Sequence, residues 1–157
     1  MTSLEDLQLK FREVTVDKLK PGALLITTLT PQDGLILKNN RKFRKKRIVV
    51  VGVDKNTEKI YGSVLVNTHL SLLSEYSSEH LAAQYELSAE NYPSFLEYNS
   101  YVDCGELFEI DVDKLLTGEY HGELTESDKD AIWEILETTD TLTTKQKKKY
   151  NKKRRKN

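Results

Sequence analysis

The sequence contains a single cysteine, Cys104, among its 157 residues. One cysteine excludes an intrachain disulfide, and such sparse use is typical of a reducing compartment. No apolar run approaches the about 18 residues that a membrane-spanning helix requires. Thr2 to Asp6 offer neither the apolar core nor the basic start of a secretory signal. We therefore expect a cytoplasmic protein with no membrane partner.

Motifs for nucleotide, nucleophile or metal chemistry are also missing. The seven glycines are scattered singly, with no P-loop and no G-x-G-x-x-G, and there is no G-x-S-x-G. The three histidines, at positions 69, 80 and 121, form no cluster in the sequence. With only one cysteine besides them, the chain lacks the ligand spacing of a zinc site. We expect no cofactor and no metal site.

Positive charge is concentrated in two places. Nine of the 24 basic residues lie between Lys145 and Lys156, and the other 15 stand against all 25 acidic residues, a net charge of −10 for residues 1–144. Seven of those 15 fall within Lys38–Arg47, directly before the apolar run Ile48–Val53. A dense cationic segment beside a rigid strand indicates a polyanionic partner.

β-Branched and apolar segments predict a mainly β fold. A turn at 54–57 makes a hairpin of the strands on either side of it. A capping-box-like start at Thr125 and Asp128 predicts an amphipathic helix after it, with Ile132 and Leu136 on one face. The natural packing is a small, strongly bent barrel that the helix covers. The expected strands span 23–29, 47–53, 59–66, 100–104, 107–110 and 119–124.

The chain divides by composition into three parts. We predict an N-terminal extension over 1–20, a barrel domain over 21–140, and a disordered basic tail over 141–157. The barrel domain carries a partly helical insertion at 70–99, in which helical spacing is possible over 72–85. Insertions of this kind commonly carry specificity or partner contacts.

Three segments together resemble the MazF/PemK-like toxins (Kid/CcdB-type). Lys20–Ile26 is similar to the family's opening strand, Arg47–Val51 to its second strand, and Tyr101–Asp111 with His121–Thr125 to its C-terminal part. The resemblance implies an SH3-like barrel. It also implies a toxin-antitoxin endoribonuclease that cleaves single-stranded RNA without metal, forms a homodimer and is blocked by an antitoxin protein.

The departures from the family pattern are local. Ile48 stands where the family commonly has proline, and Val66–His69 replaces a proline-isoleucine-threonine-like motif. The 70–99 insertion and the basic tail are additions. These differences leave two alternatives open: a non-catalytic nucleic-acid-binding barrel, or a protein-interaction module that uses the acidic body.

Metal-free RNA cleavage needs phosphate charge stabilisation and proton transfer. Arg47 suits the first task, because a guanidinium meets two phosphate oxygens at once; otherwise it is one of several loop charges. The resemblance assigns Thr68 to positioning the phosphate or ribose, and His69 is a candidate acid or base. Strand alternation would send Thr68 and His69 to opposite faces unless the strand has ended.

The sequence offers further candidate residues. Asp103 could pair with a histidine or hold Arg47, His121 reads as a surface or packing residue, and His80 has nothing near it in sequence. Cys104 reads as a core residue and Trp133 as packing or a dimer seam. Phe43 either stacks on a base or anchors its loop. The candidate nucleic-acid-binding residues are Lys38, Arg41, Lys42, Phe43, Arg44, Lys45 and Lys46.

Overall fold

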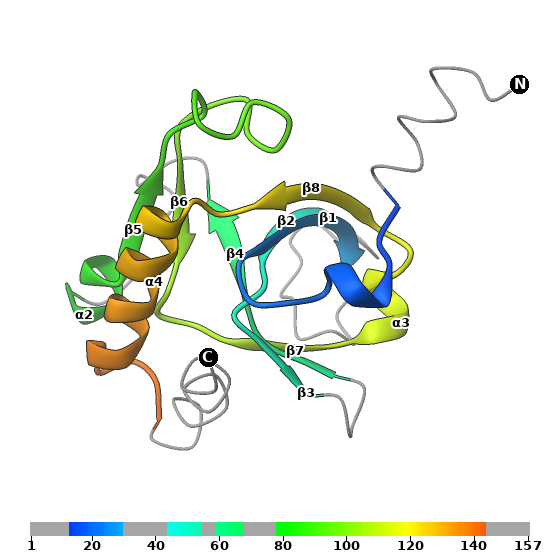
Figure 1. Cartoon of the computed structure of the whole chain (residues 1–157). Coiled ribbons are helices and arrows are strands. Elements are labelled where there is room, and N and C mark those ends of the chain that lie inside the picture. Colours follow the sequence, from blue (N-terminus) through cyan, green and yellow to red (C-terminus); the bar gives the residue numbers. More distant parts are fainter. Residues whose placement is uncertain (1–12, 30–43, 55–58, 68–77, 144–157) are drawn as a thin grey trace, which may run out of the picture.

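The computed structural model describes residues 13–29, 44–54, 59–67 and 78–143 (Figure 1). Strands dominate, and no helix in these residues is long and apolar enough to cross a membrane. The elements are η1 (Val16–Lys18), β1 (Ala23–Leu29), β2 (Arg44–Val49), β3 (Gly52–Asp54), β4 (Lys59–Asn67), α2 (Ser78–Ala82), β5 (Gln84–Leu87), β6 (Ser100–Asp103), β7 (Phe108–Asp111), α3 (Val112–Leu115), β8 (Glu119–Glu123) and α4 (Glu126–Thr138).

Every strand pair is antiparallel, and β4 belongs to all three sheets. The strands follow the order β5-β6-β4-β2-β1-β8, while β3 and β7 pair with β4 beside this path. The first half of β4 pairs with β3 and β7, and the second half with β2 and β6. The register shifts between Tyr61 and Ser63, where Gly62 stands. A glycine at such a shift lets a strand bend from one sheet into another.

The β1–β2 pair is buried on both faces. Leu24 lies opposite Val49 and Leu25 opposite Ile48, and all four side chains are fully buried. Because neighbouring residues of a strand point to opposite faces, the two pairs enter two different cores. The α4-side core includes Leu24, Val49, Phe95, Val102, Cys104, Ile132, Trp133 and Leu136. The α3-side core includes Val14, Leu19, Leu25, Leu29, Ile48, Val50, Ile60, Ile110 and Leu115.

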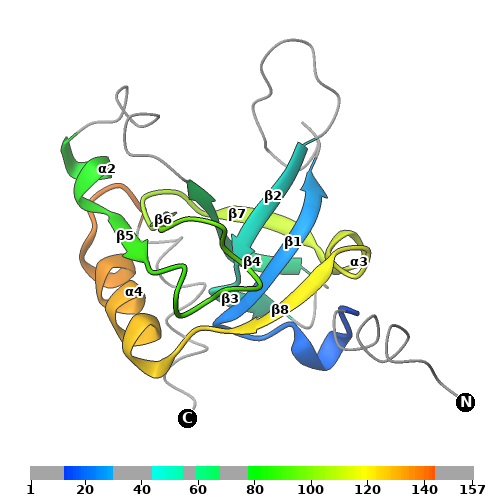
Figure 2. The same ribbon diagram turned by 90° about the horizontal axis from the view of Figure 1, so that it is seen from above.

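Helix α4 covers the sheet end that β5 and β6 form (Figures 1 and 2). Thr125 caps it, because its Oγ1 accepts a hydrogen bond from Asp128 N at 3.2 Å. Ile132, Trp133 and Leu136 are its buried face. The predicted cap and apolar face are therefore confirmed, and Trp133 is a packing residue.

Two tyrosines tie the inserted segment to α4. Tyr85 OH donates to Asp128 Oδ1 at 2.6 Å, and Tyr92 OH donates to Asp128 Oδ2 at 2.5 Å. Thr125 N in turn donates to Tyr92 OH at 3.0 Å. Hydrogen bonds to a charged group contribute more than neutral ones, about 1.5–3 kcal/mol each. Asp128 therefore joins β5 and the 88–96 segment to the start of α4.

The predicted mainly β class is confirmed, and two local predictions are corrected. The strand expected over 47–53 starts earlier, at Arg44, and ends at Val49, and a separate strand, β3, begins at Gly52. Between them, Val50 still hydrogen-bonds to the backbone of Gly22 and Ala23 at the start of β1. Helical spacing over 72–85 is wrong from position 84 onward, where β5 pairs with β6. In the described residues no strand pair joins β5 to β8, so this path stays open.

The Tyr85–Asp128 contact makes a prediction for alkaline pH. The hydrogen bond to Asp128, and burial after it, raise the pKa of Tyr85 from 10.0 to about 12. The Tyr85 hydroxyl therefore loses its proton at a lower pH in the unfolded chain than in the folded one. Its contribution to the free energy of unfolding is complete below pH 10 and is lost as the pH rises from 10 to 12. At pH 9, unfolding in urea should give a larger free energy of unfolding for wild type than for Tyr85→Phe. The difference between the two free energies should become smaller toward pH ~11.5. An unchanged gap would contradict the contact, and Val16→Ala, an exposed non-titrating change, serves as control.

Candidate functional site

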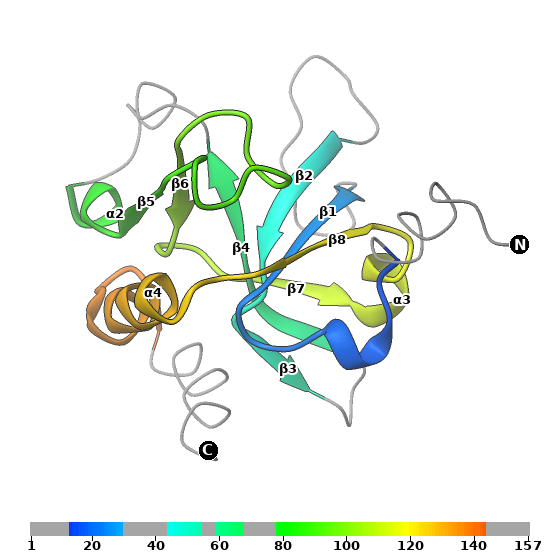
Figure 3. The same ribbon diagram turned by 45° about the horizontal axis from the view of Figure 1, so that its top comes forward.

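Arg47 lies where the basic strand meets the inserted segment. Its Nε donates to the backbone oxygen of Phe95 at 2.5 Å, and the side chain is half-buried. Arg47 stands opposite Ile26, and Ile26 stands opposite Glu119 in β8. Alternation in β2 puts Arg47 on the same face as Val49, which faces the α4-side core. Figure 3 shows the segment before β6 reaching toward β1 and β2.

His121 occupies the same face as Arg47. Its ring centroid lies 6.2 Å from that of Phe95, and its Nε2 lies 3.1 Å from Glu119 Oε2. Only 5 % of its side chain is exposed, and its buried Nδ1 has no hydrogen-bond partner among the described residues. Glu119 also attracts Lys45, with Nζ and Oε1 at 4.0 Å. A cation, an imidazole and a carboxylate thus gather around Phe95.

The predicted site residues are only partly within the described chain. Lys38, Arg41, Lys42, Phe43, Thr68 and His69 lie outside it. Arg44, Lys45 and Lys46 are strand residues of β2, whereas the sequence placed them in a polar loop. Lys45 is exposed and shares its face with Arg47, whereas Lys46 points to the opposite face. The structure therefore makes an ordered cationic strand of part of the predicted loop.

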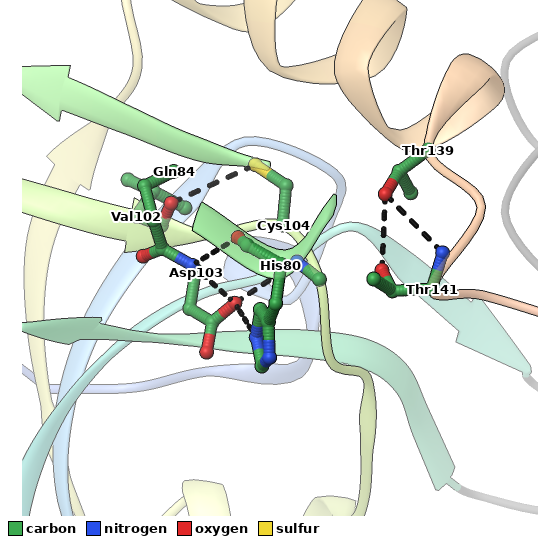
Figure 4. Close-up of polar contacts among 8 residues, drawn as sticks. His80, Gln84, Val102, Asp103, Cys104, Thr139 and Thr141 are labelled. Carbon is green, nitrogen blue, oxygen red and sulfur yellow. Dashed lines mark hydrogen bonds and ion pairs between the residues drawn. The ribbon is translucent and has the colours of Figure 1, made fainter. Parts of the chain in front are cut away.

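A second group of polar residues forms around Asp103 at the end of β6 (Figure 4). Asp103 Oδ1 accepts hydrogen bonds from Gln84 Nε2 and Gly105 N, each at 2.9 Å, and lies 2.8 Å from His80 Nε2. The Asp103 side chain is only 5 % exposed and that of His80 13 %. Glu106 completes a set whose ligand-type atoms all lie within 4.8 Å of one another. We call His80, Asp103 and Glu106 the Asp103 cluster.

The environment of this cluster is partly desolvated. Burial raises the pKa of the Glu106 carboxyl, and the nearby charge of Asp103 raises it further. Glu106 is nevertheless exposed as a residue. Burial also raises the pKa of the Cys104 thiol, whose side chain lies in the α4-side core, so Cys104 is the inert core residue that the sequence predicted.

The predicted pairing of Asp103 with a histidine is confirmed, but sequence reasoning identified neither His80 as that histidine nor Glu106 as a neighbour, because strand pairing creates the cluster. His80 and Asp103 are far apart in the chain, and β5 brings them together by pairing Gln84 with Asp103. A β-strand prediction over 84–87 would have been the necessary signal. Asp103 also lies on the opposite face of β6 from Val102, which enters the α4-side core that Arg47 faces. The two sites therefore occupy opposite sides of the sheet.

Comparison with known proteins gives no relative, since no protein-family model matches the chain and no curated protein matches it.

Gly105 tests how tightly the Asp103 cluster is built. A Cβ at this position would lie 2.2 Å from His80 Cδ2, so Gly105→Ala must displace the imidazole. We expect a loss of about 1–3 kcal/mol in the free energy of unfolding, measured in urea. In a His80→Ala background the same substitution should cost much less, because the obstructing ring is gone. Equal costs in both backgrounds would show that the ring does not constrain Gly105.

Proposed function

We propose that the chain binds single-stranded RNA along β2 and cleaves it without metal, as the MazF/PemK-like toxins that it resembles do. The position of Arg47 carries the proposal. It is the anchored end of a cationic strand, held by the Phe95 carbonyl and next to a His–Glu pair on the same face. Lys45, which shares the face of Arg47, would attract the phosphate backbone without selecting sequence.

The guanidinium of Arg47 remains equipped for phosphate. Its Nε–H is used by Phe95, and an arginine has four further N–H donors on its two terminal nitrogens. These can stabilise the negative charge that builds on the non-bridging phosphate oxygens when the ribose 2′-oxygen attacks and the bond to the 5′-oxygen breaks. The hydrogen bond to Phe95 would fix the direction of the Arg47 guanidinium, and such catalysis requires this preorganisation.

Proton transfer would fall to groups other than Arg47. A base must remove the 2′-hydroxyl proton, and an acid must protonate the departing 5′-oxygen. Thr68 and His69 remain the proposed partners from the sequence, with Thr68 positioning the phosphate. His121, with Glu119 against its Nε2, would assist by shaping the electrostatics of this face.

The fold and assembly follow the same resemblance. We propose that the strands form an open variant of the SH3-like barrel. The proposal is supported by β4, which bends between its pairing with β7 and its pairing with β2. We further propose a cytoplasmic homodimer that places RNA across a shared groove, which an antitoxin protein would block.

A second candidate is a nucleic-acid-binding protein without catalysis. The observation in its favour is that Arg47 is half-buried and already bonded to a protein carbonyl, which is also what a purely structural arginine does. The neighbouring Ile48 is apolar and fully buried in the α3-side core, so it takes no part in this face.

Cleavage of a long single-stranded RNA separates the two candidates. The purified protein should produce defined cuts that persist in EDTA, and Arg47→Ala should lower the cleavage rate by at least about 100-fold, as expected for loss of a charge-stabilising donor. Arg47→Lys should restore charge but not the bidentate geometry, and so only part of the rate. Lys45→Ala should leave the cuts in place with weaker binding.

Failure of this prediction has two forms. RNA that stays intact but is retained in a salt-sensitive manner supports the non-catalytic binder. Absence of both cleavage and retention at low salt rejects RNA as the ligand.

Tyr98 tests whether the inserted segment touches the bound strand. It follows Phe95 by three residues and is 64 % exposed, so its ring is accessible to a base. Stacking on a base is worth about 1–3 kcal/mol, so Tyr98→Ala should weaken binding of single-stranded RNA by roughly 5- to 150-fold. Tyr98→Phe keeps the ring and should bind as wild type does. Equal affinity of Tyr98→Ala and wild type, by fluorescence anisotropy, would remove Tyr98 from the interface.

A further inference from the structure

We propose that His80, Asp103 and Glu106 bind one divalent transition-metal ion, for which Zn²⁺ is the best-fitting candidate. The site lies on the opposite side of the sheet from Arg47 and does not depend on the proposed RNA cleavage. Its three residues come from α2, from the last position of β6 and from the turn after it; Figure 4 shows two of them, His80 and Asp103.

Backbone hydrogen bonds, rather than the side chains themselves, bring the ligands together. Ala83 N donates to His80 O at 3.1 Å, and Cys104 N donates to Ala83 O at 2.9 Å. The pairing of Gln84 with Asp103 continues this connection into the β5–β6 ladder. The backbone therefore holds His80 and Asp103 in position before an ion arrives, which lowers the entropic cost of binding.

The distances fit a metal site after one small movement. Zinc binds imidazole nitrogen and carboxylate oxygen at about 2.0–2.2 Å, so neighbouring ligand atoms of one ion lie about 3–3.5 Å apart. His80 Nε2 and Asp103 Oδ1 are already 2.8 Å apart, and the whole set is within 4.8 Å. Glu106 is exposed, so rotation of its side chain can bring its carboxylate to the ion.

The polar groups around the cluster are suited to orient the ligands. Gln84 Nε2 donates both to His80 O at 3.1 Å and to Asp103 Oδ1 at 2.9 Å. Nε2 of His80 binds an ion only when it carries no proton, so the imidazole then has its proton on Nδ1, while Gln84 and Gly105 still donate to Asp103. Such outer contacts fix ligand orientation and raise metal affinity.

Gln84 supplies a second observation that points to a ligand. Its Oε1 is buried and accepts no hydrogen bond from any described residue. A buried amide oxygen without a donor is costly, and three protein ligands leave a coordination position for water. A metal-bound water is a donor that would satisfy this oxygen.

The donor set decides the class of ion. Two carboxylates and a neutral imidazole carry a charge of about −2, which a divalent cation neutralises. Imidazole favours zinc and its transition-metal neighbours over Mg²⁺ and Ca²⁺, which prefer oxygen alone. Cys104 does not take part, because its sulfur lies in the α4-side core. The bound ion would tie α2 to the end of β6.

Metal content and thermal stability test the proposal. The untagged full-length protein, stripped with a chelator and desalted after incubation with ZnCl₂, should retain one zinc per chain by mass spectrometry. Its Tm should rise with zinc concentration, because the ion binds only the folded chain. Glu106→Gln should weaken zinc by at least about 100-fold, since even second-shell changes cost about 10–100-fold.

Matched variants keep the test decisive if a buried substitution fails to fold. Glu106→Gln changes an exposed side chain, and Glu134→Gln on α4 is its control. His80→Gln should behave like Glu106→Gln, whereas His121→Gln should retain zinc. No retained zinc, or equal retention in Glu106→Gln and wild type, would overturn the site. EDTA should lower the Tm while leaving any RNA cleavage intact, so the two proposals can fail independently.

Discussion

Strand β4 is the constraint on which the rest of the molecule depends. Its backbone pairs with β2, β3, β6 and β7, so one segment of nine residues carries hydrogen bonds of all three sheets. The register shift at Gly62 allows this double use, because the strand bends there. The two cores form on the two sides of the β1–β2 pair that β4 extends. β4 also contributes to both cores, with Ile60 in the α3-side core and Val66 in the α4-side core.

This arrangement also keeps the two candidate sites apart. Arg47 and His121 lie on the face of the α4-side core and meet at Phe95, which the inserted segment supplies. Asp103 points away from that core, toward α2. The Tyr85 and Tyr92 contacts with Asp128 hold the inserted segment in place, so the position of Phe95, and through it Arg47, depends on α4. Helix and site are thereby linked.

The parts predicted well are those in which local pattern and burial agree. β1 shows the apolar run that a strand buried on both faces requires, and Thr125 and Asp128 form the expected cap. Prediction failed at β5, where Gln84–Leu87 follows α2 directly and its polar residues show little strand preference. Pairing with β6 overrides that weak local preference. The sequence suggested a histidine partner for Asp103 but not that it is His80, for the same reason: His80 is positioned through β5.

By itself, the sequence determined the mainly β class, the capped final helix, the core role of Cys104 and the concentration of charge before Ile48. Each of these depends on side-chain chemistry over a few neighbouring residues. Only the tertiary structure decided that Arg47 meets Phe95, that His121 joins it, and that His80 meets Asp103. These contacts join segments distant in the chain, and they depend on which strands pair and in what register, which is settled only when the apolar faces of the strands are buried together.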